Sequence, residues 1–595
     1  MPRAHPPRPV LALRVAITGH RWDKLSRDRA SAVRDSIGEV LHAVTREVGA
    51  HLARHPDLYD GVPRLRLLSG LAEGADRLGA EAALASPGWT LHAMLPFARL
   101  DYLAECKESG SAAACAALLE SAAGVTELDG IAGRFDAYRP LEWALVEMTD
   151  LLIAVWDGEG PRGPGGTAHV VATARLADVP VVRIDSRDGA SVWLDDTGRP
   201  DHGRGGGMNA VRDAVAALLQ GPDDPDLAHR FFHERGALGV PARLYDRVVS
   251  FATGHRVPPV APMEQDPGAQ RAAGLRGLMT VLPPTVTEAA AGGFGPLLGW
   301  SDALATWYAA LHRRSFTALF LLASMAVAFG TAARVLPFVG DAWPGHVSEI
   351  LEVVILLAML AVLHRARRGA WQQRWLDYRA LAERSRHLWL LWPEVRSTEH
   401  ARAPRDRVDE DPRAGWVAWL VRSTVRAADV PTGNLGGAYP RVVRDWLGHT
   451  EVASQRAFHA RRRVREGRLG EPLGHLSERM VQVAVLLAFG RVALGVADPA
   501  AAEGAASLVV AAIATALPAL AAGLHGFAGL ADFEGLGLRS AAIEGRLAQI
   551  ARQLEALDSP TLETIGTLVR RLTRAMEGEL GAWHASSASR QPHVG

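Results

Sequence analysis

The sequence predicts an α/β, Rossmann-like N-terminal domain followed by an all-α membrane region with four transmembrane helices in two hairpins. Within the first 190 residues, apolar runs of strand length alternate with helical patterns. That alternation is typical of βαβ units in a parallel sheet. After Ser315 the apolar runs become long enough to cross a bilayer. A sheet domain and a membrane region are therefore expected on one chain.

Composition narrows the classes of protein to which the chain can belong. At 595 residues it is long enough for about two to four domains. Its formal net charge is zero, which gives no argument for nucleic acid binding. The two cysteines, Cys106 and Cys115, are too few for a disulfide framework or a zinc site. We therefore expect no metal, no required cofactor, no direct nucleic acid binding, and a reducing, cytoplasmic setting for the soluble part.

Short apolar runs predict five strands in the N-terminal part. The runs are Leu11–Thr18, Arg64–Ser69, Thr90–Leu95, Leu151–Trp156 and Val179–Ile184. Helical spacing of the apolar residues predicts helices between these strands. The helices cover Arg27–His51, Asp76–Leu84, Leu100 to about Ala123, Pro140–Met148 and Thr167–Ala177.

Three loops rich in glycine and small polar residues follow these strands: Thr18–Arg21, Ser69–Asp76 and Asp157–Thr167. In open parallel sheets, ligands bind beyond the carboxyl ends of the strands, where the strand order reverses. The stretch Leu151–Ala172 has the strand, glycine loop and helix arrangement that favours a phosphate or another anion. The predicted ligand-binding residues are Thr18, Gly19, His20, Arg21, Ser69, Gly70, Glu73, Gly74, Asp76, Asp157, Gly158, Gly165, Gly166 and Thr167.

Each of these residue types also has a purely structural explanation. The glycines permit tight turns and close packing of helix on sheet. Glu73 suits the first turn of a helix, where the dipole favours a carboxylate. His20 is also compatible with a capping or core histidine, and Thr167 with an N-cap. The sequence leaves these alternatives open.

The loop motifs resemble those of SLOG domains, the Rossmann-like relatives of LOG nucleotide hydrolases and of the Smf family. The resemblance rests on ITGHR (Ile17–Arg21), SGLAEGADRLGAEAA (Ser69–Ala83) and AVWDGEGPRGPGGTAHVV (Ala154–Val171), and covers roughly residues 10–190. It implies a domain that binds nucleotides or their derivatives, often as a sensor in bacterial conflict systems.

One departure from that family concerns catalysis. LOG enzymes carry paired glutamates after the loop threonine, whereas Thr167 is followed by Ala168, His169 and Val170. General acid–base chemistry needs a positioned titratable group, and those carboxylates are missing. Binding is therefore favoured over hydrolysis. The alternative is a membrane-tethered nucleotide or NAD hydrolase that uses Glu73, Asp76 or His169.

The remaining chain divides into a connector and two membrane modules. Residues 191–299 contain short helices and proline-rich stretches, with no assignable site. Residues 300–465 and 466–595 each contain one predicted hairpin. The four predicted spans are Ser315–Ala333, Ile350–Leu363, Met480–Val496 and Gly504–Leu524. For the two middle runs, buried soluble helices are the alternative.

The arginines that flank the predicted spans are concentrated on one side, and this distribution predicts the orientation of the chain in the membrane. They lie before the first and third spans and after the second and fourth, while the two loops within the hairpins carry a single arginine. The positive-inside rule then places the N-terminus and the soluble domains in the cytoplasm of a multi-pass membrane protein. This topology puts Glu352 and Arg491 at similar depth, where they either pair within the bundle or snorkel to the interface.

A second resemblance covers residues of about 300–590. Trp371–Arg386 reads W-x3-W-L-D-Y-R-x-L-A-E-R-x-R after a membrane hairpin. This pattern resembles the SLATT family, two-transmembrane effectors that are associated with SLOG domains. Trp446-Leu447, Gln455–His459 and Phe533–Ser540 resemble a continuation of that module.

Together these patterns predict a ligand-gated membrane effector in bacterial defence. A nucleotide-derived signal, which an upstream synthase could supply, would bind the sheet domain. Binding would shift a homo-oligomer so that its transmembrane helices perturb or perforate the lipid bilayer. A non-catalytic membrane scaffold is the third interpretation, beside the effector and the hydrolase.

Overall fold

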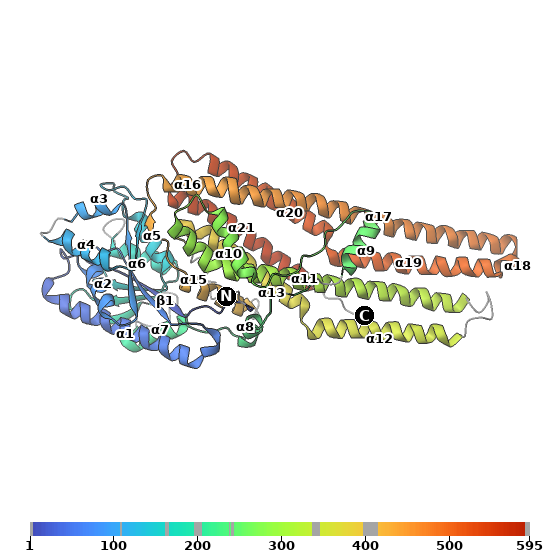
Figure 1. The fold of residues 1–595 in the computed structure, drawn as a ribbon, viewed down its shortest axis with the longest axis horizontal. Coiled ribbons are helices and arrows are strands. Elements are labelled where there is room, and N and C mark those ends of the chain that lie inside the picture. Colours follow the sequence, from blue (N-terminus) through green and yellow to red (C-terminus); the bar gives the residue numbers. More distant parts are fainter. Residues whose placement is uncertain are drawn as a thin grey trace.

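The computed structural model describes residues 4–106, 110–160, 166–195, 205–236, 238–239, 243–335, 345–396 and 414–589. A sheet domain lies at one end of the molecule, and long helices extend away from it as a rod (Figure 1). Far from the sheet, the rod ends in long helices that lie side by side.

The sheet has nine strands among the described residues, in the order β8-β7-β6-β5-β1-β2-β3-β4-β9. Neighbouring strands from β6 to β9 run parallel, whereas β7 and β8 are antiparallel. The strands are β1 (Ala12–Gly19), β2 (Arg64–Ser69), β3 (Trp89–Leu95), β4 (Gly124–Glu127), β5 (Leu151–Val155), β6 (Val181–Ile184), β7 (Val192–Asp195), β8 (Gly205–Gly206) and β9 (Gly433–Asn434). The predicted α/β sheet is confirmed.

Helices connect and cover these strands. They are α1 (Ala30–Arg54), α2 (Ala75–Ala85), α3 (Arg99–Ala104), α4 (Ser111–Ser121), α5 (Arg139–Met148), α6 (Thr167–Leu176) and α7 (Met208–Leu218). Because crossovers between parallel strands are right-handed, α1, α2 and α4 lie on one face and α5 and α6 on the other. In agreement, α2 packs against α1 and α4, and α5 packs against α6.

Several elements of the sheet domain differ from those predicted, and the short strands β7 and β8 were not predicted. The helix predicted from Leu100 to about Ala123 is two helices, α3 and α4, with residues 107–109 outside the described part. The four-residue strand β4 was not predicted, because it starts at Gly124 and is too short to show alternation. Strand β9 comes from the helical half of the chain and pairs with Thr126 and Glu127 of β4.

The helical region begins in the predicted connector and supplies the rod. Its helices are α8 (Pro225–Phe232), α9 (Leu244–Thr253), α10 (Pro267–Leu278), α11 (Pro284–Val335), α12 (Gly345–Arg368), α13 (Trp371–Leu391), α15 (Ala414–Ala427), α16 (Tyr439–Trp446), a π-helical segment η6 (Leu447–Val452), α17 (Ala453–Ala497), α18 (Pro499–Ala502), α19 (Ala505–Ala531), α20 (Phe533–Glu555) and α21 (Leu562–Ser589). Near the sheet, α13 packs along the first half of α11 and against α15 and α21.

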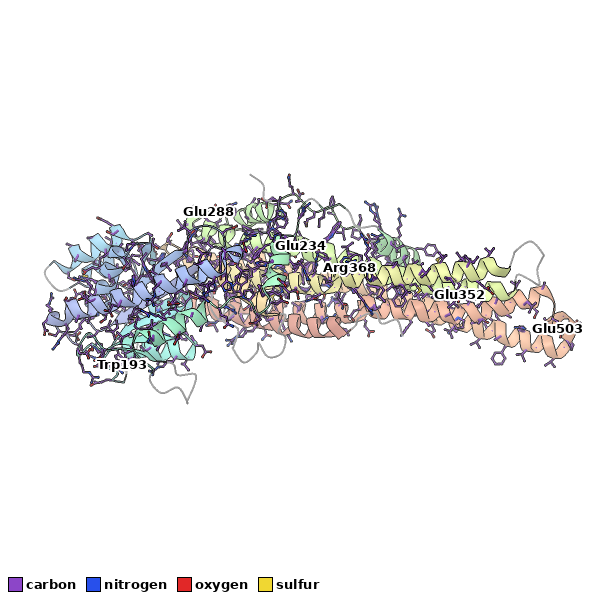
Figure 2. All side chains as sticks on the ribbon, turned by 90° about the horizontal axis from the view of Figure 1, so that it is seen from below. Trp193, Glu234, Glu288, Glu352, Arg368 and Glu503 are labelled. Atoms are coloured by element: carbon purple, nitrogen blue, oxygen red, sulfur yellow. The ribbon has the colours of Figure 1, made fainter. Side chains whose placement is uncertain are left out.

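A buried acid joins the connector to these helices. Glu234, just after α8, accepts hydrogen bonds from Tyr308 of α11 (2.9 Å) and Tyr378 of α13 (2.8 Å). Arg374 lies 3.1 Å from the same carboxylate. Glu234 lies midway along the molecule, where the sheet domain gives way to the rod (Figure 2). Tyr378 and Arg374 of α13 therefore join the connector to α11 at a buried carboxylate.

Three helical stretches of the described residues are long and apolar enough to cross a membrane: Pro284–Thr331, Tyr439–Ala497 and Ala505–Glu555. Only 22%, 6% and 11% of the residues in their most apolar windows are buried. Such exposure is compatible with a membrane protein, because water does not tolerate apolar surface of this extent. The predicted span Ile350–Leu363 lies in α12, which is not among the three. The four-span arrangement stays a prediction.

Candidate functional site

The strand order reverses between β1 and β5, and their carboxyl ends lie side by side at this reversal. From β1 the chain steps through β2 and β3 to β4 in one direction and then returns to β5 on the other side of β1. Register pairs Thr18 with Ala154 and Gly19 with Val155, so that the two strands end together. The loops after β1 and β5 therefore meet at the position where such sheets bind ligands.

Beyond these strand ends His20 and Asp157 face each other. The His20 Nε2 atom lies 3.7 Å from Asp157 Oδ1, and its Nδ1 atom lies 3.1 Å from the Ser186 hydroxyl. The His20 side chain is 7% exposed and that of Asp157 19%. Burial lowers the pKa of His20, and the nearby Asp157 carboxylate only partly opposes this shift. His20 is thus neutral at pH 7 and able to donate or accept one hydrogen bond.

The loop after β2 packs directly on the loop after β1. The backbone N–H of Ala75 donates to the His20 carbonyl oxygen (3.1 Å). Gly74 has a φ of +97°, and a Cβ atom there would lie 2.5 Å from the same oxygen. A Cβ atom on Gly19 would lie 2.4 Å from the Ala75 Cβ atom. Close approach of two backbones is therefore the demonstrable reason for these glycines.

Asp76 is a buried acidic residue beside the loops after β1 and β2. It lies in the first turn of α2, and its carboxylate accepts a hydrogen bond from the Ala72 N–H (3.4 Å). Burial raises its pKa to about 7, while backbone N–H groups of Ala72 and Gly19 and the charge of Arg21 oppose the shift. Asp76 can therefore exchange a proton near neutral pH.

Arg183 fixes the backbone of the loop after β5. Its guanidinium donates to the carbonyl oxygens of Trp156 (3.2 Å) and Asp157 (2.9 Å). Gly158 has a φ of +87°, and a Cβ atom there would lie 2.6 Å from Arg183 Nη1. The arginine thus occupies the space beside Gly158 and holds the loop close to β6.

Two other predicted residues, Glu73 and His169, have partners away from these strand ends, and Thr167 begins a helix. Glu73 accepts a short hydrogen bond from the Ser111 hydroxyl of α4. His169 lies 2.6 Å from Glu142 of α5, through its Nδ1 atom. Thr167 is the first residue of α6 and makes no capping hydrogen bond, because Gly166 is the N-cap. Of the three residues named for hydrolysis, only Asp76 contacts the loop after β1.

The remaining predicted residues are placed as follows. Ser69 is buried and donates to the Asp76 carbonyl oxygen (3.1 Å). The Gly70 carbonyl oxygen accepts from Tyr102 (2.8 Å). Arg21 is exposed, and its guanidinium lies 5.7 Å from the Tyr138 ring. Gly165 lies outside the described residues.

Glu352 and Arg491, which were predicted to lie at membrane depth, are on α12 and α17, and both are exposed. Figure 2 shows Glu352 in the part of the rod far from the sheet. Among the ion pairs of the described residues, none joins the two side chains. Their pairing stays a prediction that concerns the assembled bundle.

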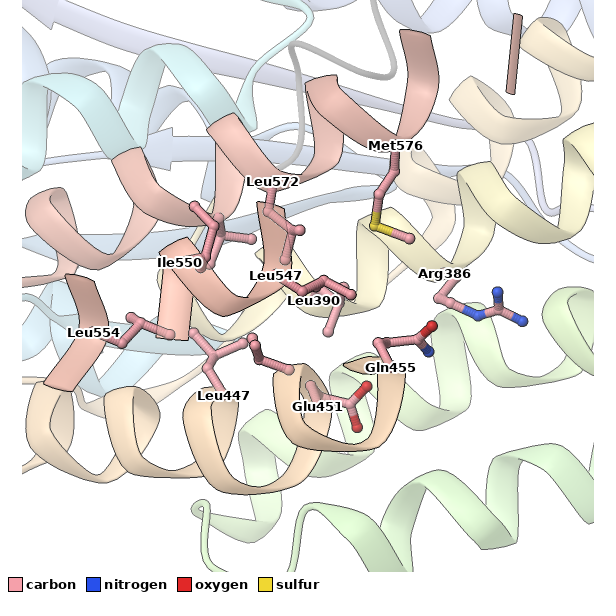
Figure 3. A pocket seen from close by; sticks show the side chains of 12 residues that line it. Arg386, Leu390, Leu447, Glu451, Gln455, Leu547, Ile550, Leu554, Leu572 and Met576 are labelled. Carbon is pink, nitrogen blue, oxygen red and sulfur yellow. The ribbon is translucent and has the colours of Figure 1, made fainter. Parts of the chain in front are cut away.

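A small pocket lies elsewhere, between α13, η6, α20 and α21 (Figure 3). Its volume is about 10 Å³, room for one water molecule at most. Apolar side chains such as Leu447, Leu547 and Met576 form most of its wall, with Arg386 and Glu451 at one side. It is a packing defect in the helical core and too small for a nucleotide.

Sequence reasoning missed several residues that build the site. Ser186, which forms a hydrogen bond with His20, follows β6. The loop after this strand was not among the predicted ligand-binding loops. Glu142 and Arg183 were read as helix and strand residues, although Glu142 is only 2% exposed. The available signal was a charged residue within a run of residues that were otherwise expected to be buried. A buried carboxylate requires a hydrogen-bonding or charged partner.

The helix α5 links the site to the helical region. At one position, Glu142 binds His169 and Thr173 of α6, the helix that follows the glycine loop. Five residues later, the Glu147 carboxylate accepts a hydrogen bond from Arg570 of α21 (3.1 Å). The start of α21 is held as well, because the Leu562 N–H donates to Asp129, just after β4 (2.7 Å).

No protein-family model matches this chain, and no curated protein is similar to it.

Proposed function

We propose that the chain is a membrane effector whose sheet domain senses a nucleotide-derived ligand. The observation that carries the proposal is the meeting of the loops after β1, β2 and β5 at the reversal of strand order, on one chain with exposed apolar helices. Backbone N–H groups at the start of α2 and α6 suit phosphate oxygens. His20 and Asp157 suit the hydroxyl and ring groups of a nucleoside. A SLOG-like sensor joined to a SLATT-like module is the corresponding family assignment.

The path of the chain supports a fourth span in α12. After α12 the chain returns to α13, where Arg379 lies 3.2 Å from Asp302 on the first half of α11. If α11 crosses a bilayer and α12 does not, α13 and the first half of α11 are on opposite sides. The exposed face of α12 is also apolar; its members include Ile350 (62% exposed), Val353 (55%), Leu357 (59%) and Leu360 (57%). Two hairpins, with all soluble parts in the cytoplasm, satisfy both facts.

The link through α5 supports a route from ligand to membrane. A phosphate at the glycine loop shifts the start of α6, and Glu142 carries that shift into α5. The pair of Glu147 and Arg570 then passes it to α21, which packs on α13 and α20. In an oligomer, such a shift changes how the membrane helices pack and so perturbs or perforates the bilayer. Bacterial defence is the setting in which this output is useful.

The test is ligand binding by the full chain in detergent. Cyclic and linear nucleotides and NAD are titrated by calorimetry against the wild type, Asp157→Ala and Asp60→Ala, the last as a control at the opposite edge of the sheet. We expect one ligand to bind the wild type and the control, and to bind Asp157→Ala at least tenfold more weakly. Dye release from liposomes with that ligand then tests the output. No binding by the wild type contradicts the sensor, and sealed liposomes contradict the effector.

A second candidate function is hydrolysis of the bound nucleotide, which Asp76 favours. A buried carboxyl with a pKa of about 7 at a ligand edge has the property of a general acid or base. Release of a free base or nicotinamide by the purified chain, lost in Asp76→Asn, supports this function. Glu73→Ala tests the other carboxylate, whose hydrogen bond to Ser111 predicts a smaller effect.

A further inference from the structure

The short helix α9 lies across the base of the predicted spans (Figure 1). Its inner face packs into an apolar cluster formed by three membrane helices. The Tyr245 ring lies 6.1 Å from that of Phe316 on α11 and 5.8 Å from that of Phe527 on α19. Val249 is fully buried in the same cluster, with Leu473 of α17. One short helix thus touches three of the long helices.

These contacts fix the depth of α9. Phe316 is the second residue of the first predicted span, and Phe527 lies just after the end of the fourth. Leu473 precedes the third span by fewer than two turns of helix. Each contact is therefore at the cytoplasmic end of a span, where the hydrocarbon meets the headgroups.

The outer face of α9 is unusual for a surface in water. Arg243, Arg247 and Phe251 follow one another at intervals of four residues, which places them on one side of the helix. All three are exposed, and the Phe251 ring is 92% exposed. An aromatic ring beside two arginines is the pattern of a helix that lies in a membrane interface.

More arginines surround the helix. We name six exposed residues near the base of the spans the basic collar; they are Arg243, Arg247, Arg256, Arg314, Arg465 and Arg468. Arg313 lies with its guanidinium 5.4 Å from the Tyr245 ring. The helix α9 packs on α11, which carries Arg314, and on α17, which carries Arg465 and Arg468. The acid of α9, Asp246, is half-buried and does not share the outer face.

We propose that α9 and the basic collar form a binding surface for anionic phospholipid headgroups of the cytoplasmic leaflet. Phe251 inserts among the acyl chains, and Arg243 and Arg247 contact the phosphates. The proposal rests on the membrane location in the proposed function. Its occupant is a bilayer rather than a soluble anion, because α9 packs at the ends of the predicted spans and exposes an aromatic ring beside its arginines.

Hydrogen exchange of the full chain in nanodiscs tests this surface. Peptides that cover residues 243–256 are compared in discs of phosphatidylcholine alone and in discs with phosphatidylglycerol. We expect slower exchange with phosphatidylglycerol, and loss of that difference in Arg243→Gln/Arg247→Gln. Each arginine near an anionic surface contributes about fivefold to binding, so the pair accounts for roughly thirtyfold. The control is Arg46→Gln/Arg54→Gln on α1, which should behave as the wild type.

Two further measurements separate the possible failures. Phe251→Ser should speed exchange in both kinds of disc, because insertion of the ring needs no charge. Equal exchange in both discs, or a phosphatidylglycerol effect that the double variant retains, overturns the proposal. A chain that never enters the discs overturns the membrane location instead, and with it the proposed function.

Discussion

The Glu147 carboxylate of α5 accepts a hydrogen bond from the Arg570 guanidinium of α21 at 3.1 Å. The same carboxylate oxygen lies 3.5 Å from Arg396, just after α13. Only 8% of the Glu147 side chain is exposed. Two segments of the helical region therefore share one buried acid of the sheet domain. A second pair between α5 and α21, formed by Arg139 and Glu563, is half exposed (51% and 40%).

These two ion pairs give a matched test of the contact between α5 and α21. Glu147→Gln removes the buried carboxylate that Arg396 and the half-buried Arg570 share, and we expect a loss of about 3 kcal/mol of stability. Arg139→Gln removes a solvent-screened pair and should cost less than about 1 kcal/mol. Thermal unfolding of the detergent-solubilised chain measures both. If Glu147→Gln still binds the ligand but no longer releases dye, the contact between α5 and α21 also carries the signal. Equal losses of stability in Glu147→Gln and Arg139→Gln would argue against a special role of the buried pair.

Asp76 predicts a specific dependence of stability on pH. Its pKa is raised from 3.8 to about 7, so the folded state binds this proton more tightly than the unfolded state. Stability from this group is complete below about pH 4 and is lost as the pH rises through 7. The loss is on the order of 4 kcal/mol for a fully buried carboxyl.

Asp76→Asn removes this titration. Relative to the wild type, the variant should gain stability as the pH rises from 4.5 to 8, measured as the difference in melting temperature at the two values. Asp60→Asn, on an exposed acid, serves as the control and should follow the wild type. A constant difference between Asp76→Asn and the wild type at both pH values would show that the residue does not titrate in this range.

Replacement of Gly74 and of Gly49 by alanine should change stability in opposite directions. At Gly74 the positive φ and the His20 carbonyl oxygen both exclude a side chain, so Gly74→Ala should cost at least about 2 kcal/mol. Gly49 lies in α1 with nothing within 4 Å of an added Cβ atom. There alanine should stabilise the helix by about 0.5–1 kcal/mol. Chemical unfolding measures both, and weaker ligand binding by Gly74→Ala alone would tie the loop contact to the site.

Local patterns were enough for much of the sheet and for the strand ends at which the candidate site lies. Arg64–Ser69 was predicted with its exact bounds, because a buried parallel strand between turn signals is a strong pattern. The glycine loops were found because strand ends and turn residues are local features. Their grouping at one edge followed from the parallel sheet.

Contacts between residues that lie far apart in the chain could not be predicted from local sequence patterns. Strand β9 has two residues and joins β4 only because the helical half docks on the sheet. Arg14 is 2% exposed and donates to the Ala428 carbonyl oxygen at the end of α15 (2.6 Å), although a strand pattern gives no reason to bury a cation. The pair of His20 and Ser186 depends in the same way on which strands become neighbours.

The number of spans gives the last prediction. In a background with Cys106→Ser and Cys115→Ala, single cysteines replace Glu349, Arg368 or Glu503, all of which are exposed. Figure 2 shows Glu503 at the far tip of the rod and Arg368 nearer the sheet. With four spans, a membrane-impermeant maleimide added to intact bacterial cells labels Glu349→Cys and Glu503→Cys, because both lie outside. Arg368→Cys reacts only after permeabilisation, since α12 returns the chain to the cytoplasm. Labelling of Arg368→Cys in intact cells would mean that α12 does not cross, and the packing of α13 on α11 could then not survive in the membrane.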